Sequence, residues 1–329
     1  MASPPSTYTP DQIEAYLQRI GYADSASTSG NTRHQHLQQC IEKDPLAALT
    51  ELQRRHLGAI PWGNSGLHYS QLRAISIHPA SVFEKLVVRK LDGYCMENTN
   101  LLYVVLRSLG YQVYPTGGRV SRAAAAGSNA VVGYQALVAF ADEGRSGHMV
   151  LIVTIGGQKY MVDVGFGSNC PTSPLPMKEN EVTVCIAPSE MRLIKDSIPE
   201  LVDRSQKLWI YQVRYNPESE WIPMYSFSEV EFLPQDFGVM NFATSKNPTS
   251  WFTQAFVCTK VILSEDGLEP RGIYVMSGKE VKKRLGKETQ VVATLANEND
   301  RRQALAKYFD MHFQDYDVEG IQGLSSQIK

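Results

Sequence analysis

Residues 89–110 read RKLDGYCMENTNLLYVVLRSLG, and the interpretation of the whole chain starts from them. Asp92-Gly93 signals a turn, and the residues from 101 to 109 are apolar on nearly every helical face up to Gly110, a typical C-cap. This pattern predicts a buried helix with Cys95 at its N-terminus. Helix N-termini stabilise thiolates, so we expect the pKa of Cys95 to lie below the free-cysteine value of about 8.5. The alternative is that Cys95 is only a small buried hydrophobic residue.

Composition limits the classes of function. The chain has 329 residues, 43% of them hydrophobic and 20% charged, which is typical of a globular protein with two or three domains. A net charge of −2 provides no general attraction to nucleic acid or anionic membrane, and no apolar run approaches the roughly 18 residues of a membrane span. We therefore expect small-molecule partners, and a protein that is a monomer or a weak homodimer.

The cysteines indicate a reducing compartment. They are odd in number, widely scattered and never spaced as C-x-x-C, which argues against a disulfide framework and a zinc site: Cys40, Cys95, Cys170, Cys185 and Cys258. No H-E-x-x-H motif occurs, so no metal is expected. The first residues lack the basic and apolar regions of a secretory signal. These features predict a cytoplasmic protein.

Helix and strand signals divide the chain into three parts. Helix starts at Thr9-Pro10, Asp44-Pro45 and His78-Pro79 predict a helical bundle over residues 1–112 that carries Cys95. Short β-branched or aromatic runs separated by glycines predict a β-barrel or strongly bent sheet over 113–232, with strands near 111–114, 134–140, 148–155, 159–164, 182–186 and 209–215.

Residues 233–329 are predicted to form a small α/β unit, or lid, with strands at 256–263 and 271–276 and a helix at 300–309. The tail from 317 either frays or packs as an extended segment. Small residues at 122–129 are compatible with a mobile loop beside a cleft or with an ordinary surface loop. The predicted fold class is therefore α+β and multidomain, with helical bundle, β-barrel and α/β lid.

One hairpin brings two chemically active residues together. Gly156-Gly157 is a two-residue turn signal between the strands that contain His148 and Asp163. If the strands pair symmetrically about these glycines, His148 lies opposite Gly165, and Asp163 is its diagonal neighbour on the same face. A loop of odd length would place the two side chains on opposite faces.

A histidine that acts as a general base and the carboxylate that orients it must lie side by side on one face in this way. A carboxylate that accepts one imidazole N–H leaves the other nitrogen free and favours the imidazolium form. Cys95 is the best nucleophile for the pair, which predicts a Cys95-His148-Asp163 triad. The alternatives are a hydrogen-bonded strand histidine and a solvent-facing turn carboxylate. No dinucleotide-binding or phosphate-binding glycine motif is present.

Several motifs together carry a resemblance to a known family. They run through nearly the whole chain in order: Ile60-Pro-Trp-Gly-Asn64, Gly93-Tyr-Cys-Met-Glu97, Arg119-Val120, His148 with its apolar strand, Val162-Asp-Val-Gly-Phe-Gly167, Pro234-Gln-Asp-Phe-Gly-Val-Met-Asn241 and Thr244-Ser-Lys-Asn-Pro-Thr-Ser-Trp-Phe252. The chain resembles the arylamine N-acetyltransferase family, and Gly-Tyr-Cys-Met-Glu-Asn is most similar to its fungal branch.

The resemblance implies a cysteine-proteinase-like fold of bundle, barrel and lid, and maps nucleophile, base and orienter onto Cys95, His148 and Asp163. It implies ping-pong transfer of an acetyl group from acetyl-CoA to arylamines or arylhydrazines, as in xenobiotic detoxification, without a metal. It also implies a substrate pocket lined by Trp62, Tyr94, Arg119, Val120, Phe166, Gly167 and Ser168.

The chain departs from the family pattern at two places. The Arg-Gly-Gly that usually precedes the aromatic-Cys pair is Leu91-Asp92-Gly93, so the arginine is missing from its place, and whether Arg89 or Lys90 substitutes for it stays open. The asparagine expected four residues after the cysteine is Thr99.

Because Asp92 adds negative charge beside the nucleophile, we expect acetyl-CoA to be preferred over malonyl-CoA, since an unpaired buried carboxylate is costly. The alternatives are a malonyl-CoA or other acyl-CoA donor, with Arg89, Lys90 or Arg119 binding the second carboxylate, a papain- or transglutaminase-like thiol hydrolase, and a non-catalytic binding module.

Overall fold

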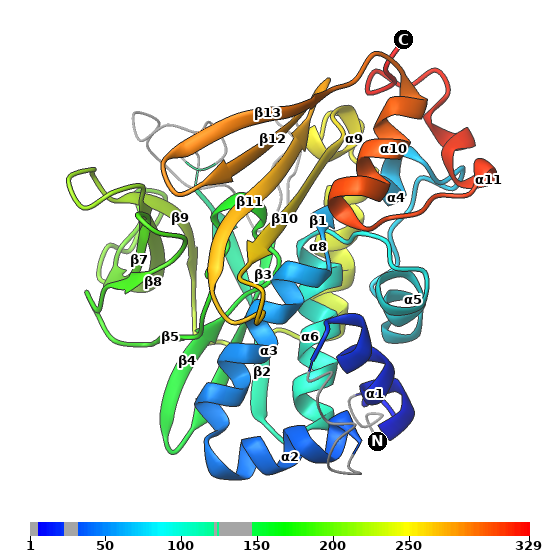
Figure 1. The fold of residues 1–329 in the computed structure, drawn as a ribbon. Helices are drawn as coiled ribbons and strands as arrows, with labels where there is room; N and C mark the ends of the chain where they lie inside the picture. The colour runs from blue at the N-terminus through cyan, green and yellow to red at the C-terminus, as the bar shows by residue number, and fades with distance from the viewer. Residues whose placement is uncertain (1–5, 23–31, 122–123, 125–146) are drawn as a thin grey trace.

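The computed structural model describes residues 6–22, 32–121, 124 and 147–329, and Figure 1 shows how they form helices, a curved sheet and a second, smaller sheet. The strand predicted at 134–140 lies outside these residues. So does the loop predicted at 122–129, apart from residue 124.

The N-terminal helices begin where the capping signals predicted. Thr9 accepts the N–H of Gln12 at the start of α1 (Pro10–Arg19), and Asp44 accepts the N–H of Ala47 at the start of α3 (Pro45–Ala59). Helix α2 (Arg33–Lys43) was not predicted, because its sequence is polar on most faces. Its only local signal is a capping box between Thr32 and Gln35.

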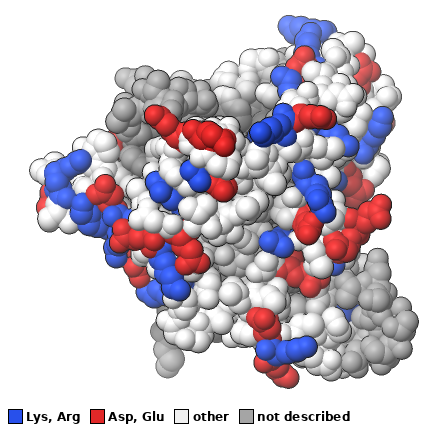
Figure 2. Space-filling model, turned by 60° about the vertical axis from the view of Figure 1, so that its left-hand side comes forward, with Lys and Arg blue, Asp and Glu red and all other residues white. Residues whose placement is uncertain are grey.

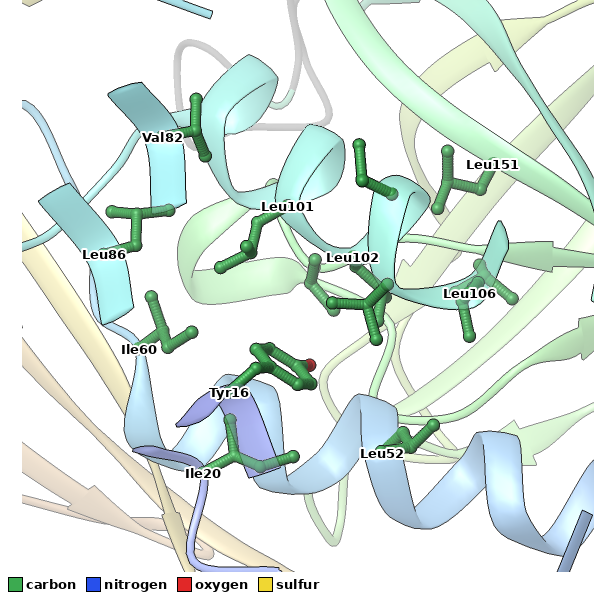
Figure 3. Close-up of a cluster of buried hydrophobic side chains, with 14 of the residues drawn as sticks. Tyr16, Ile20, Leu52, Ile60, Val82, Leu86, Leu101, Leu102, Leu106 and Leu151 are labelled. Atoms are coloured by element: carbon green, nitrogen blue, oxygen red, sulfur yellow. The ribbon is translucent and has the colours of Figure 1, made fainter. Parts of the chain in front are cut away.

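Helix α6 (Cys95–Ser108) is the centre of the first core. Figure 3 shows Leu101, Leu102 and Leu106 of α6 above Tyr16 of α1 and Leu52 of α3. A short α4 (Ser65–His68), α5 (Pro79–Phe83) and the π-helical turn η2 (Glu84–Val88) complete this part. Gly110 has φ +86°, the left-handed conformation that ends the helix as predicted.

Eight antiparallel strands form the curved sheet, in the order β5-β4-β3-β2-β9-β8-β7-β6. They are β2 (Gln112–Val120), β3 (Gly147–Ile155), β4 (Gln158–Val162), β5 (Leu175–Pro176), β6 (Thr183–Val184), β7 (Glu190–Asp196), β8 (Leu208–Arg214) and β9 (Ile222–Phe227). Strand β3 is buried on both faces. Met149, Leu151 and Val153 pack in the core around α6, whereas Val150 and Ile152 pack in a second core within the curved sheet.

The smaller sheet joins residues 62–63 to strands from the last third of the chain. Its order is β1-β10-β11-β12-β13, from β1 (Trp62–Gly63), β10 (Val257–Leu263), β11 (Pro270–Ser277), β12 (Glu280–Leu285) and β13 (Glu288–Thr294). Trp62 pairs with Thr259 and Gly63 with Cys258, so the segment ahead of the Cys95 turn is an edge strand of the last sheet.

The remaining helices are α8 (Pro234–Lys246), α9 (Trp251–Gln254), α10 (Glu298–Phe309) and α11 (Asp315–Val318). The tail packs onto the body: Arg301 donates to the Ser326 carbonyl at 2.8 Å, and Glu298 accepts the N–H of Ile328 at 2.7 Å. The tail therefore packs rather than frays, but residues 315–321 form the helical turns α11 and η4 (Glu319–Ile321) instead of the extended segment that was predicted.

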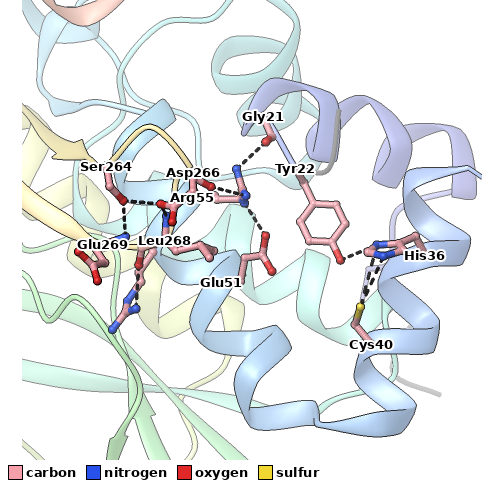
Figure 4. A network of polar contacts seen from close by, with 11 residues as sticks. Gly21, Tyr22, His36, Cys40, Glu51, Arg55, Ser264, Asp266, Leu268 and Glu269 are labelled. Atoms are coloured by element: carbon pink, nitrogen blue, oxygen red, sulfur yellow. Dashed lines mark hydrogen bonds and ion pairs between the residues drawn. The ribbon is translucent and has the colours of Figure 1, made fainter. Parts of the chain in front are cut away.

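A polar network ties α3 to other parts of the chain. Figure 4 shows Arg55 bonded to Glu51 at 2.6 Å, to the Gly21 carbonyl at 2.6 Å and to the Asp266 carbonyl at 2.9 Å. Asp266 lies in the turn between β10 and β11. One guanidinium therefore links α3 to the end of α1 and to the smaller sheet.

Basic and acidic side chains are intermixed across the face in Figure 2. Among the described residues, no helix is long and apolar enough to cross a membrane. That same part of the chain contains no group of three or more His, Cys, Asp or Glu side chains placed to hold a metal ion.

Candidate active site

The hairpin has the register that its glycines predicted. Leu151 pairs with Val162 and Ile155 with Gln158, symmetrically about Gly156-Gly157. His148 in β3 and Asp163, directly after β4, therefore share a face, and His148 Nε2 lies 2.7 Å from Asp163 Oδ2. Both side chains are buried. Neither the odd-length loop nor the solvent-facing carboxylate is observed.

Asp163 is held by further donors. The Gly165 N–H donates to Oδ1 at 2.7 Å, and the Tyr225 hydroxyl of β9 donates to Oδ2 at 2.8 Å. Gln53 of α3 donates to the Asp163 carbonyl at 3.0 Å. These hydrogen bonds fix the position of the carboxylate, and it orients the imidazole through Nε2 so that Nδ1 faces away from Asp163.

Cys95 lies beside this pair. Its Sγ is 3.9 Å from the carbonyl oxygen of Gly147, the residue before His148. Among the described residues, no hydrogen bond joins Sγ to the imidazole. Gly165 fixes how closely the helix approaches the loop after β4, because a Cβ there would lie 2.7 Å from both the Cα and the carbonyl oxygen of Cys95.

Burial decides the ionisation of the isolated thiol. Desolvation, followed by the negative charge of Asp163, raises the pKa of Cys95 to about 12, and the Met96 N–H at the helix N-terminus lowers it by less. The expectation that the helix terminus alone lowers the pKa is therefore wrong. A thiolate at this position needs a neighbouring positive charge.

The predicted pocket residues lie on four different segments. Gly167, with φ +71°, packs on Trp62, since a Cβ there would lie 3.0 Å from the indole ring. The ring of Phe166 is 5.0 Å from that of His148. Ser168 is half-buried in the same short turn.

Val120, Tyr94 and Arg119 come from other elements. Val120 pairs with Tyr225, and the Tyr94 hydroxyl donates to Asn241 of α8. Arg119 lies in register with Gly147 on one side and Ser226 on the other.

Three residues of this site were missed in the sequence. Tyr225, Gln53 and Phe252 come from three different elements, and Phe252 stacks edge-on against both Trp62 and Tyr94. No local motif marks them as partners of the triad. The thiol of Cys170 also donates to the Asp163 carbonyl, at 3.3 Å.

The charged residues of the turn before Cys95 have different surroundings from those that the sequence suggested. Asp92 is buried, and its carboxylate accepts from the N–H and the hydroxyl of Ser65. These bonds direct the Asp92 carboxylate toward Ser65, and its expected effect on the acyl donor stays a prediction. Neither proposed substitute takes the place of the missing arginine, because Arg89 pairs with Asp317 at 2.5 Å and Lys90 is exposed.

We predict that Gly165→Ala slows alkylation of Cys95 and lowers the free energy of unfolding by about 1–3 kcal/mol, because the added methyl group overpacks against Cys95. The measurements are the iodoacetamide rate at Cys95 and urea denaturation. Gly238→Ala in α8 is the matched control, since nothing lies within 4 Å of its Cβ position. Equal, small effects of the two substitutions would contradict the close approach at residue 165.

Comparison with known proteins adds a family to this geometry. The model of a family described as N-acetyltransferase matches residues 45–318. The chain is 34% identical to the N-malonyltransferase FDB2 of Gibberella moniliformis, over 95% of this chain and 92% of that protein. It is 27% identical to arylamine N-acetyltransferase 2 of Mus musculus, over 75% and 77% of the two chains.

Solved structures agree in fold. The arylamine N-acetyltransferase of Salmonella typhimurium has a TM-score of 0.71 at 20% identity, over 95% of this chain and 98% of that one. The Mycobacterium marinum enzyme in complex with CoA has a TM-score of 0.67 at 24% identity, over 95% and 99%. The resemblance seen in the sequence and the predicted fold class are confirmed, and the chain belongs to the arylamine N-acetyltransferase family.

Proposed function

We propose that this protein transfers an acyl group from acyl-CoA to the amine of an arylamine or arylhydrazine through an acyl-Cys95 intermediate. The observation that carries the proposal is the buried His148–Asp163 pair, joined at 2.7 Å next to Cys95, in a chain of this family. Relatives named arylamine N-acetyltransferases support the arylamine as acceptor.

In the first half-reaction His148 Nδ1 takes the proton of the Cys95 thiol, and Sγ attacks the carbonyl carbon of the acyl-CoA thioester. The carbon–sulfur bond to CoA breaks. The departing thiolate receives the proton from the imidazolium, so the products are free CoA and an acyl-cysteine thioester.

In the second half-reaction the amine nitrogen attacks the acyl-cysteine carbon, and His148 takes the proton that the nitrogen loses. The bond to Sγ then breaks, the amide leaves, and the proton returns to Cys95. Asp163 stabilises the imidazolium in both halves and stays ionised.

The raised pKa of the isolated thiol fits this proposal. A buried thiolate is costly alone, but it becomes favourable when an imidazolium, itself neutralised by Asp163, lies next to it. The proposed resting nucleophile is therefore an ion pair rather than a free thiolate.

A papain-like or transglutaminase-like enzyme would use the same triad and differ in the acceptor, which would be water or a protein amine. A non-catalytic binding module would keep the fold without an acylated cysteine. The size of the acceptor and the appearance of acyl-Cys95 distinguish these two alternatives from the proposal.

The acyl group has two candidates. Acetyl, the sequence-based expectation, follows the name of the family. A malonyl group is supported by relatives named N-malonyltransferase. It is also supported by Arg119, whose side chain makes no ion pair or hydrogen bond with the described residues and is therefore available for a carboxylate.

Residues in register share a face of the sheet, so Arg119 lies between Ser226 on one neighbouring strand and, on the other, Gly147, whose carbonyl contacts Cys95. The buried Ser226 hydroxyl also lacks a partner among the described residues. A guanidinium and a hydroxyl are suitable donors for a second carboxylate.

We predict that acyl-CoA alone adds one acyl mass to the wild-type protein at Cys95 and that an arylamine removes it, as intact-protein mass spectrometry would show. Cys95→Ser forms no such adduct, because a hydroxyl cannot form the ion pair. Cys170→Ser is the matched control and keeps the adduct. Acylation of the Cys95→Ser variant at the wild-type rate would show that Cys95 is not the nucleophile.

We further predict that malonyl-CoA is used at least as well as acetyl-CoA when both are present at equal concentration. Arg119→Gln should then lower malonyl transfer about tenfold relative to acetyl transfer, since hydrogen bonds to charged groups contribute about 1.5–3 kcal/mol. Arg107→Gln, on the distant end of α6, should leave the ratio unchanged. An acetyl preference that Arg119→Gln does not alter would favour the acetyl donor instead.

A further inference from the structure

Lys85 lies at the base of the turn that carries Cys95. We infer that Lys85, from η2, is the positioning residue for the nucleophile, because its ammonium group holds the carboxylate that fixes the N-terminus of α6. The inference deepens the proposed function and rests on Cys95 being the nucleophile.

The contacts form a chain from the ammonium group to the backbone beside Cys95. Lys85 Nζ lies 2.7 Å from Glu97 Oε1, and the Glu97 side chain is 1% exposed. The other oxygen of Glu97 accepts the N–H of Tyr94 at 3.1 Å. Tyr94 is the N-cap residue of α6, so the position of Glu97 fixes where the helix, and with it Cys95, begins.

A second buried carboxylate shares this cation. Burial raises the pKa of both Asp92 and Glu97, and the charge of Lys85 lowers both. Asp92 in turn is bonded to Ser65, and Gly93 exchanges backbone hydrogen bonds with Pro61 and Gly63 at 3.2 and 3.0 Å. Two carboxylates thus hold the turn from either side, and one ammonium compensates both of them.

Neighbouring charges do not duplicate this role. Arg89 and Asp317 pair with each other, and Glu84 is exposed. All three line the same cavity of about 660 Å³ as Lys85 and Glu97. The cavity continues between α4 and the C-terminal segment, where Tyr69, Phe313 and Tyr316 line it. Small molecules therefore have a path to the ammonium group.

Without Lys85, Glu97 would be a buried carboxylate with no cation, so its pKa would rise further and its protonated form would be favoured. A protonated carboxyl is a weaker acceptor for the Tyr94 N–H, so the start of α6 would loosen. Loss of Lys85 should therefore reduce the reactivity of Cys95 without any contact between Lys85 and substrate.

The test compares Lys85→Met, Lys85→Arg, Lys85→Met/Glu97→Gln and, as matched control, Arg89→Met. The readouts are the iodoacetamide rate at Cys95 from pH 6 to 9, the split between kcat and KM for acyl-CoA, and circular dichroism. We expect Lys85→Met to slow alkylation about tenfold at pH 7 and to lower kcat with little change in KM, whereas Arg89→Met stays near wild type.

The difference in alkylation rate between Lys85→Met and the wild type should shrink as pH rises, because Glu97 ionises again above its raised pKa. Lys85→Arg should restore most of the rate, and Glu97→Gln should restore part of it in the Lys85→Met background by removing the buried charge. Ethylammonium chloride should speed alkylation of a Lys85→Ala variant through the cavity, and should leave the wild type unchanged.

A folded Lys85→Met protein with the wild-type alkylation profile would overturn the inference, as would an equal loss in Arg89→Met. The alkylation readout needs no acyl-CoA. Failure of the proposed acyl transfer would appear as a wild-type protein without acyl-Cys95, whatever the Lys85 variants do.

Discussion

The bond between His148 Nε2 and Asp163 Oδ2 is the interaction on which the rest of the site depends. It joins two buried groups that are each unfavourable alone, and it orients the imidazole so that its other nitrogen can serve Cys95. Tyr225 and the Gly165 N–H complete the partners of the carboxylate, so the pair stays satisfied within an apolar core.

The fold brings three distant segments to this bond. Cys95 lies at the start of helix α6, and His148 and Asp163 lie on the hairpin of β3 and β4. Trp62 lies in β1, the edge strand of the smaller sheet. Strand β3 is buried on both faces because it separates the core around α6 from the core within the curved sheet. The site therefore lies where the two cores meet.

Sequence patterns predicted the parts of the site that depend on residues close together in the chain. The turn glycines fixed the register that places His148 beside Asp163, and the apolar run after Cys95 predicted α6. Contacts between distant segments could not be predicted in this way. No sequence pattern near Tyr225 or Gln53 indicates a hydrogen bond to Asp163, and none near Lys85 indicates its ion pair with Glu97. The effect of the helix N-terminus on the Cys95 thiol was overestimated for the same reason, because the burial that raises its pKa comes from the whole fold.

We propose that the Cys95 thiolate exists only as the partner of His148, and ultraviolet absorbance of the thiolate across a pH titration tests this most directly. Cys170, whose pKa burial also raises, is replaced by serine in both proteins compared, so that Cys95 dominates the change. We predict a thiolate signal at neutral pH that Asp163→Asn abolishes, with ionisation of Cys95 then confined to strongly alkaline pH. A neutral-pH thiolate that survives Asp163→Asn would contradict it.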